Sequence, residues 1–564
     1  MAINEVFRIC PSTGLKIHKP AENLIKANAV AAVVFLAIGG LFGLMVALTR
    51  WPAVHLLPAD WFYLALTAHG LDVLLVWIIF FEMAVLYFAS AILLNSRLAT
   101  PRWAWVGFWM MLVGALVVNA AVLAGNSSVM FTSYVPMQAH WSFYLGFLLF
   151  AVGALIGTFV FFGTLVVAKD EKTYEGSVPL VTFGALTAAI IAVFTIASGA
   201  IILIPTFLWS LDMGIVNYID PLMYKTVWWA MGHSSQQINV SAHVAVWYAI
   251  AAIVLGAKPL SEKVSRTAFL LYILFLQLAS AHHLLVEPGI SSTWKIFNTS
   301  YAIYLAVLGS MIHGMTVPGS IEAAQRARGL TNGVFEWLRK APWGNPAFSG
   351  MFMSLVMFGF LGGISGVVMG TEQLNLIMHN TLYVPGHFHA TVVAGTTLAF
   401  MAITYLLIPL IFQRELILKG WAKLQPYVFA IGVGGISLFM MGAGTLGVPR
   451  RDWDIQGADS VLSFDYPATA YLMMGLNGMA ATLAAVGGLM YVVVVVGSIL
   501  FGERTADKKP EPGVAEQASV VGHYGSAGTL KLPGTAILVT LFFTAFVLYY
   551  FVNWKYLSEV WPLR

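Results

Sequence analysis

The chain has 564 residues, of which 59% are hydrophobic and only 10% are charged, and its formal net charge at pH 7 is +4. A soluble domain carries about 25% charged residues, so the composition excludes a soluble protein, and no basic tract suggests nucleic-acid binding. The apolar runs are long and continuous, which excludes a transmembrane β-barrel made of short alternating strands. The sequence therefore predicts an all-α protein embedded in membrane lipid.

Thirteen apolar segments follow one another along the chain, each long enough to cross a bilayer as a helix of about 20 residues. Their approximate bounds are residues 28–48, 60–94, 103–124, 139–167, 180–207, 225–256, 265–285, 297–315, 345–369, 383–412, 424–446, 468–501 and 533–553. The connections are short, so we expect one polytopic membrane domain over residues 1–564. The first 25 residues lack the apolar core and cleavage site of a signal peptide.

Lys and Arg residues are distributed unevenly between alternate connections. The N-terminus and the even-numbered connections hold 22 of the 29, and the opposite side holds seven. Positive residues concentrate on the cytoplasmic side of membrane proteins. We therefore expect a prokaryotic cytoplasmic (inner) membrane protein with a cytoplasmic N-terminus and an external C-terminus.

Two histidines open the tenth predicted span, in the sequence His387-Phe388-His389. Ionisable residues inside a membrane are costly and usually functional. Residues two apart on a helix point about 200° apart, so the two imidazoles face opposite sides of the helix. The pattern indicates that each can serve a different metal centre.

Histidines in three other spans are further candidates for metal ligands. His282 and His283 are adjacent near the outer end of the seventh span, and His233 lies in the sixth. Three neutral imidazoles suit copper, zinc or iron, although an adjacent pair can equally face lipid headgroups. His69 stands alone in the second span, where a lone histidine is more often a hydrogen-bonded core residue, and the following Gly70 permits close approach of a flat macrocycle.

Taken together, these histidines resemble those of subunit I of the heme–copper oxidase superfamily. The shared pattern is one histidine in the second span, one in the sixth, an adjacent pair in the seventh and His-x-His in the tenth. The resemblance covers nearly the whole chain and is closest to the B-type branch. Other stretches that agree are His140–Gly146, Glu287–Gly289, Thr293–Lys295, Pro342–Phe348, His379–Thr381 and Val448–Arg451.

The resemblance implies a low-spin heme b with two axial histidines, His69 and His389. A heme with both axial positions filled is an electron carrier. Arg450 and Arg451 would pair with heme propionates, which suits the fork geometry of guanidinium. His379 would also lie near a propionate.

The resemblance further implies a second, high-spin heme held by His387 alone, whose a-, b- or o-type stays open. His233, His282 and His283 would hold a third metal opposite its free face. We expect copper there rather than iron, because three imidazoles with no evident carboxylate ligand suit copper better.

One position departs from the oxygen-reducing members of the B-type branch. Those members carry a tyrosine four residues after the span-six histidine, covalently tied to a copper-ligating histidine, and this chain has Gln237 there. An amide cannot form a phenoxyl radical. Another branch places its tyrosine about six residues before the paired histidines, where this chain has Leu276, and the nearest tyrosine, Tyr272, lies a turn further away.

Nitric-oxide-reducing relatives also lack this tyrosine and commonly carry a glutamate at that spacing. Reducing two NO to N2O and water takes two electrons and two protons, whereas reducing O2 to two waters takes four of each. Two hemes and one further metal can run the first reaction without a radical side chain. We therefore expect the catalytic subunit of a respiratory NO reductase, as in denitrification, with Gln237 and Gln236 hydrogen-bonding an N–O intermediate or ordered water.

Three alternatives stay open. The first is a B-type cytochrome c or quinol oxidase that reduces O2 to water with proton translocation. The second is a transporter with a similar bundle, which predicts no heme. The third is a gas sensor, which needs only one open heme and leaves the pair His282 and His283 without a purpose.

Electron and proton supply follow from the same comparison. The only cysteine is Cys10, so the chain has no CuA-type site, and a subunit II is expected to take electrons from a cytochrome c, a cupredoxin or quinol. The hydroxyl positions that carry protons in span eight of B-type oxidases are not kept. Tyr248 is kept, and Ser310, His313 and Thr316 lie one residue off, so we expect a broken or rerouted proton path.

Overall fold

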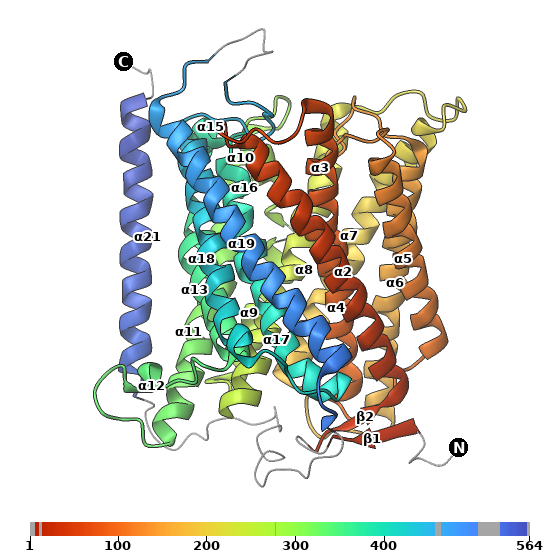
Figure 1. Cartoon of the computed structure of the whole chain (residues 1–564), viewed down its shortest axis with the longest axis vertical. Coiled ribbons are helices and arrows are strands. Elements are labelled where there is room, and N and C mark those ends of the chain that lie inside the picture. The colour runs from red at the N-terminus through yellow and green to blue at the C-terminus, as the bar shows by residue number, and fades with distance from the viewer. Residues whose placement is uncertain (1–5, 11–13, 277, 457–463, 506–530, 561–564) are drawn as a thin grey trace.

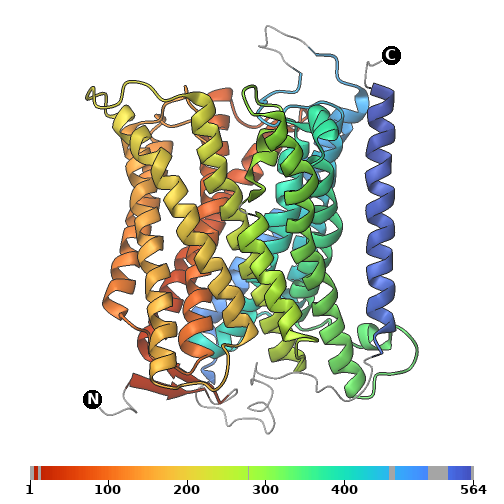
Figure 2. The same ribbon diagram turned by 180° about the vertical axis from the view of Figure 1, so that it is seen from behind.

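The computed structural model describes residues 6–10, 14–276, 278–456, 464–505 and 531–560. It is a bundle of long helices that run in roughly one direction (Figures 1 and 2). A small antiparallel pair, β1 (Phe7–Ile9) with β2 (Lys16–His18), lies at the end of the bundle where α2 begins. The predicted all-α membrane architecture is confirmed.

The first half of the bundle contains six membrane-spanning helices. The second of them continues through two π-helical stretches. The elements are α2 (Lys19–Arg50), α3 (Ala59–Leu71), η1 (Asp72–Val76), α4 (Trp77–Tyr87), η2 (Phe88–Ile92), α5 (Pro101–Leu123), α6 (Trp141–Asp170), α7 (Leu180–Ser210) and α8 (Pro221–Leu255).

The second half contains six further spanning helices, so that the described part of the chain has 12 in all. Several are again composed of α-helical and π-helical pieces. The elements are α9 (Glu262–Leu271), η3 (Tyr272–Leu276), η4 (Ser280–Leu284), α10 (Ser292–Phe297), η5 (Asn298–Ala302), α11 (Ile303–Ala327), α12 (Glu336–Arg339), α13 (Pro346–Met357), η6 (Phe358–Gly363), α14 (Ile364–Met369), α15 (Glu372–Met378), α16 (Tyr383–Phe388), η7 (His389–Thr397), α17 (Leu398–Leu407), η8 (Ile408–Phe412), α18 (Lys419–Thr445), α19 (Ala468–Phe501) and α21 (Pro533–Val560).

The predicted seventh span, residues 265–285, falls on α9, the π-helix η3 and the 3-10 helix η4. Residue 277, between η3 and η4, lies outside the described residues. Helix α2 begins at one end of the bundle and α21 ends at the opposite end (Figures 1 and 2), which requires an odd number of crossings. The segment from α9 to η4 accounts for the crossing beyond the 12 long helices.

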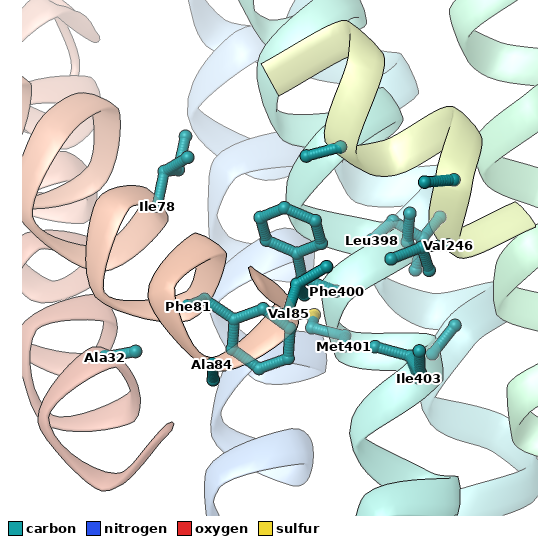
Figure 3. Close-up of a cluster of buried hydrophobic side chains, with 14 of the residues drawn as sticks. Ala32, Ile78, Phe81, Ala84, Val85, Val246, Leu398, Phe400, Met401 and Ile403 are labelled. Atoms are coloured by element: carbon teal, nitrogen blue, oxygen red, sulfur yellow. The ribbon is translucent and has the colours of Figure 1, made fainter. Parts of the chain in front are cut away.

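Small residues and aromatic side chains pack the bundle. A Cβ on Gly114 of α5 would lie 2.5 Å from the carbonyl oxygen of Gly146 on α6, so the two backbones are in direct contact, as is common between membrane helices. In the core between α4, α8 and α17, the rings of Phe81 and Phe400 stack with centroids 4.7 Å apart (Figure 3). This packing lies beside α8 and the segment α16–η7, which carry three of the histidines discussed below, His233, His387 and His389.

Candidate metal centres

Three histidines that are distant in sequence meet in the interior. His233 comes from α8, and His282 and His283 come from η4. One nitrogen of each lies within 4.8 Å of the others, and Nδ1 of His233 lies 3.0 Å from Nε2 of His283. Two nitrogens bonded to one ion at about 2 Å each lie about 3 Å apart, so the donors converge as a metal site requires. The 3-10 helix η4 thus places the paired histidines opposite α8.

Neighbouring groups orient two of these rings. Nδ1 of His282 is hydrogen bonded to the carbonyl oxygen of Ala279, which leaves its Nε2 for a metal. The ring of His283 stacks on Trp229 with centroids 3.8 Å apart and an interplanar angle of 6°, and Trp229 donates a 2.7 Å hydrogen bond to the hydroxyl of Tyr134. Supports of this kind fix the orientation of metal-binding imidazoles.

The third ring is held by Gln237, whose side chain is buried. Its side-chain amide lies 3.3 Å from Nε2 of His233, one helical turn before it. Each nitrogen of His233 therefore has its own neighbour: Nδ1 faces His283 and Nε2 faces the amide. The amide nitrogen is the atom placed there. With Nδ1 on a metal, Nε2 carries the proton, and the amide turned over presents its oxygen as the acceptor.

A second pair of histidines faces across a gap between α3 and η7. The rings of His69 and His389 are nearly parallel, at 19°, with centroids 6.3 Å apart. Nδ1 of His69 is bonded to the carbonyl oxygen of Gly39 at 2.8 Å, and Nδ1 of His389 to that of Pro385 at 2.7 Å. Both Nε2 atoms are thus left for a ligand, and the gap accommodates two metal–nitrogen bonds of about 2 Å each, end to end.

A cavity of about 460 Å³ surrounds this pair, and its lining includes both histidines, Gly43, Gly70 and the two arginines of the loop after α18. The volume is in the range of a bound cofactor. Gly43 on α2 lies directly beside the His69 ring, because a Cβ there would come within 2.5 Å of Cε1. Gly70, which the sequence singled out, borders the cavity but packs mainly against Phe131. Sequence reasoning missed Gly43, whose contact with His69 exists only in the folded bundle.

Two arginines border the same cavity from the loop that follows α18. Arg451 donates a 3.2 Å hydrogen bond to Thr132 and lies over the ring of Tyr134. Burial, and then the charge of Arg450, lower the pKa of Arg451 to about 10, which leaves it cationic at pH 7. Arg450 is partly buried, and its Nε atom is fully buried without a hydrogen-bond partner in the described part of the chain. An unsatisfied buried guanidinium nitrogen calls for a ligand, and heme propionates match it chemically.

His379 lies with both arginines in a smaller polar pocket of about 70 Å³, which His282 and His283 also border. Burial, and next the charge of Arg450, lower the pKa of His379 to about 4, so its ring is neutral at pH 7. The pocket therefore joins the predicted propionate residues to the three-histidine cluster.

His387 points away from the His69–His389 pair, as its position two residues before His389 predicts. Its Nδ1 lies 2.9 Å from the hydroxyl of Ser365, which leaves Nε2 for a metal. A Cβ on Gly366 would lie 2.9 Å from the ring, so this glycine gives the imidazole room. His387 also interacts electrostatically with His282, which places it on the side of the three-histidine cluster.

Gln236 does not join these histidines. Its amide lies 3.2 Å from that of Asn239 and 3.5 Å from the hydroxyl of Ser235. Asn239 in turn lies 2.9 Å from a carboxyl oxygen of Glu82 on α4. The sequence analysis missed Glu82, although a carboxylate inside an apolar span is itself a functional signal. The predicted role of Gln236 towards a reaction intermediate stays a prediction.

The polar residues offset by one position in α11 are each hydrogen bonded to a tyrosine of a neighbouring element. The hydroxyl of Tyr248 lies 2.6 Å from Thr316, 3.0 Å from Nδ1 of His313 and 3.1 Å from Ser265. The hydroxyl of Tyr272 is bonded to Ser310 at 3.1 Å. This arrangement is compatible with the rerouted proton track, which stays a prediction.

Comparison with known proteins decides the family. The family model described as "Cytochrome C and Quinol oxidase polypeptide I" matches residues 23–486. The chain belongs to this family. Within it, "Cytochrome c oxidase subunit 1" of Thermus thermophilus is 32% identical over 488 residues, which cover 84% of this chain and 84% of that protein. "Quinol oxidase subunit 1" of Bacillus subtilis is 22% identical, covering 79% and 68%.

A solved structure agrees with this membership of the cytochrome c and quinol oxidase family. A chain from a cryo-EM structure of a heme-copper terminal oxidase dimer has a TM-score of 0.81 and 26% identity, covering 96% of this chain and 92% of that one. The protein is thus a catalytic subunit of the heme–copper oxidase superfamily, an oxidoreductase whose family binds hemes and copper. The transporter and gas-sensor alternatives are excluded.

Proposed function

We propose that this subunit is of the B-type branch and reduces nitric oxide to nitrous oxide. The observation that carries the proposal is Gln237, whose amide lies 3.3 Å from Nε2 of His233. That is the position from which the tyrosine of oxygen-reducing relatives is tied to a metal-binding histidine. A hydrogen bond between the ring and the amide would orient the ring as that link does, but the amide supplies neither an electron nor a proton.

The residues present fit the cofactors that the family implies. His69 and His389 would hold a low-spin heme b, His387 a high-spin heme, and His233 with the pair in η4 a copper ion. When bound, these centres supply the redox chemistry. The buried Nε of Arg450 and the cavity of about 460 Å³ support this complement, because both are explained by heme propionates and a heme ring.

The stoichiometry of the two candidate reactions favours NO. Reducing O2 to two waters takes four electrons and four protons, and relatives use the linked phenol for one of each. In this chain the phenols of Tyr248 and Tyr272 are hydrogen bonded within the polar cluster of α8, η3 and α11. Reducing two NO to N2O and water takes only two electrons and two protons, so no phenol is needed.

The protein's own residues position the reaction and its substrates. Gln237 and Trp229 hold the rings of His233 and His283. An apolar cavity of about 180 Å³ extends from Trp229 between α4, α6, α7 and α8, and apolar space of this kind suits a small uncharged gas. Arg450 and Arg451 would fix propionates at the end of the bundle opposite the start of α2.

We extend the proposal to topology and partners. The N-terminus is cytoplasmic and the C-terminus external, in a prokaryotic inner membrane, as the distribution of Lys and Arg indicates. A subunit II delivers electrons at the external end, where the loop with Arg450 lies. Its donor is a cytochrome c, a cupredoxin or quinol.

A second candidate is reduction of O2, favoured by the names of the relatives, which are cytochrome c and quinol oxidases. The purified complex, given a reductant and either gas, separates the two. N2O production at a rate far above O2 consumption supports the proposal. Rapid O2 consumption without N2O establishes the oxidase.

A further inference from the structure

Glu82 is a carboxylic acid buried in a membrane-spanning helix. It belongs to α4, and 4% of its surface is exposed. No charged group of the described residues interacts with it. An isolated carboxylate is expensive to bury, whereas a protonated carboxyl with a hydrogen-bond acceptor is not. Carboxyls of this kind inside membranes commonly belong to proton relays.

The polar groups around Glu82 form a chain of hydrogen bonds. One carboxyl oxygen of Glu82 lies 2.9 Å from the side-chain amide of Asn239, whose nitrogen donates to it when the amide is turned towards Glu82. The amides of Asn239 and Gln236 lie 3.2 Å apart, that of Gln236 lies 3.5 Å from the hydroxyl of Ser235, and Ser235 donates to the carbonyl oxygen of Gly232 at 2.8 Å. The chain therefore reaches from Glu82 to the residues next to His233.

A cavity runs beside this chain towards the metal histidines. It has a volume of about 180 Å³, and its polar lining includes Glu82, Ser235, Gln236 and Asn239. Its lining also includes Trp229, whose ring stacks on His283. Roughly 10–15 Å³ of such space admits one water, so the cavity has room for a water chain along its polar wall.

We propose that Glu82 carries protons to the reaction site. In each transfer the O–H bond of the carboxyl breaks, and the proton passes along water in the cavity to the oxygen that leaves as water. The carboxylate then takes up one proton from the cytoplasmic side, so Glu82 returns to its starting state. Asn239 and Gln236 hold the carboxyl and orient the water.

This inference rests on the proposed function only in that turnover consumes protons, which holds for NO and for O2 alike. The two can therefore fail separately. Product analysis identifies which gas the enzyme reduces. The role of Glu82 is then tested with variants that are assayed with that gas.

The test uses the purified complex with three variants. Glu82→Gln keeps a donor towards Asn239 but has no proton to release, Glu82→Asp shortens the acid, and Tyr248→Phe interrupts the alternative cluster. We expect unchanged heme and copper content in all three. Glu82→Gln slows turnover by roughly 100-fold, within the usual contribution of a proton-transfer group, and Glu82→Asp restores part of it. Turnover of Glu82→Gln equal to wild type overturns the proposal, whatever Tyr248→Phe does.

An infrared measurement separates a proton carrier from a structural residue. The oxidised-minus-reduced difference spectrum of the wild-type complex, labelled with ¹³C-glutamate, should contain a shifted C=O stretching band of a protonated carboxyl. Glu82→Gln should remove that band. If Glu82→Gln does not assemble, the labelled wild-type spectrum and Glu82→Asp decide. A spectrum without a glutamic acid C=O band overturns the proposal.

Discussion

The side-chain amide of Gln237 lies 3.3 Å from Nε2 of His233, and Nδ1 of the same ring lies 3.0 Å from His283. The amide thus occupies the one ring nitrogen that a metal bound among the three histidines does not need. It fixes both the rotation of the ring and the position of its proton. Residues that orient a ligand in this way contribute about 10–100-fold to metal affinity.

Gln237→Ala should therefore weaken copper binding by about 10–100-fold. The remaining ring is free to rotate and to exchange its proton between the two nitrogens. Copper per heme, measured by mass spectrometry after dialysis against graded chelator, checks this. Thr226→Ala is the control, because Thr226 is exposed on the same helix. Equal copper retention in Gln237→Ala and wild type would show that the amide does not support the ligand.

The two histidines of α16–η7 should have separable spectra. Replacing His389 with Ala removes one of the two ligands that face across the cavity, so the six-coordinate low-spin signal is lost while the gas-binding high-spin signal stays. Replacing His387 has the opposite effect. Optical and EPR spectra of the purified variants measure both signals. Loss of the same signal in both variants would mean that the two rings serve one centre.

Gly43 should be required for the low-spin heme. A Cβ at this position would lie 2.5 Å from the His69 ring, so Gly43→Ala displaces the ring and lowers low-spin heme occupancy. Gly40→Ala is a matched control, since Gly40 lines the same cavity but its Cβ would meet nothing within 4 Å. Pyridine hemochrome analysis gives the heme content. A heme content equal to wild type in Gly43→Ala, together with an unshifted optical spectrum, would contradict a requirement for glycine beside His69.

Removing the charge of Arg450 should lower heme midpoint potentials. A cation beside the propionates stabilises the electron on the reduced heme, by about 1–2 kcal/mol at roughly 10 Å and an effective dielectric constant near 20. Spectroscopic redox titration of Arg450→Gln measures the shift. Arg97→Gln is the control, because Arg97 pairs with Glu171 away from this loop. An unchanged heme midpoint potential in Arg450→Gln would show that Arg450 does not lie beside the heme propionates.

The directions in which the histidines point follow from the sequence, because helical geometry is local. Helical spacing alone separates His387 from His389, and it places Gln237 one turn from His233. The same spacing puts Gln236 about 100° away, so it meets Asn239 and Glu82 instead of the metal histidines. Hydropathy marks a span without showing the type of its helix, so the π-helical and 3-10 pieces within residues 265–285 do not follow from the sequence.

Contacts between segments that are distant along the chain could not be predicted from the sequence. Gly43 meets His69 only because α2 packs on α3. Glu82 reaches Asn239 only because α4 packs on α8. The family resemblance implies roles for the histidines. It implies none for Gln237, where this chain differs from its oxygen-reducing relatives.

The central claim is that this subunit reduces NO, and product stoichiometry tests it most directly. The purified complex with its hemes and copper is given a reductant and isotopically labelled NO without oxygen, and gas-phase mass spectrometry counts labelled N2O. The account predicts one doubly labelled N2O for every two NO consumed, with little O2 consumption in a parallel run. Rapid O2 consumption with no labelled N2O would contradict it.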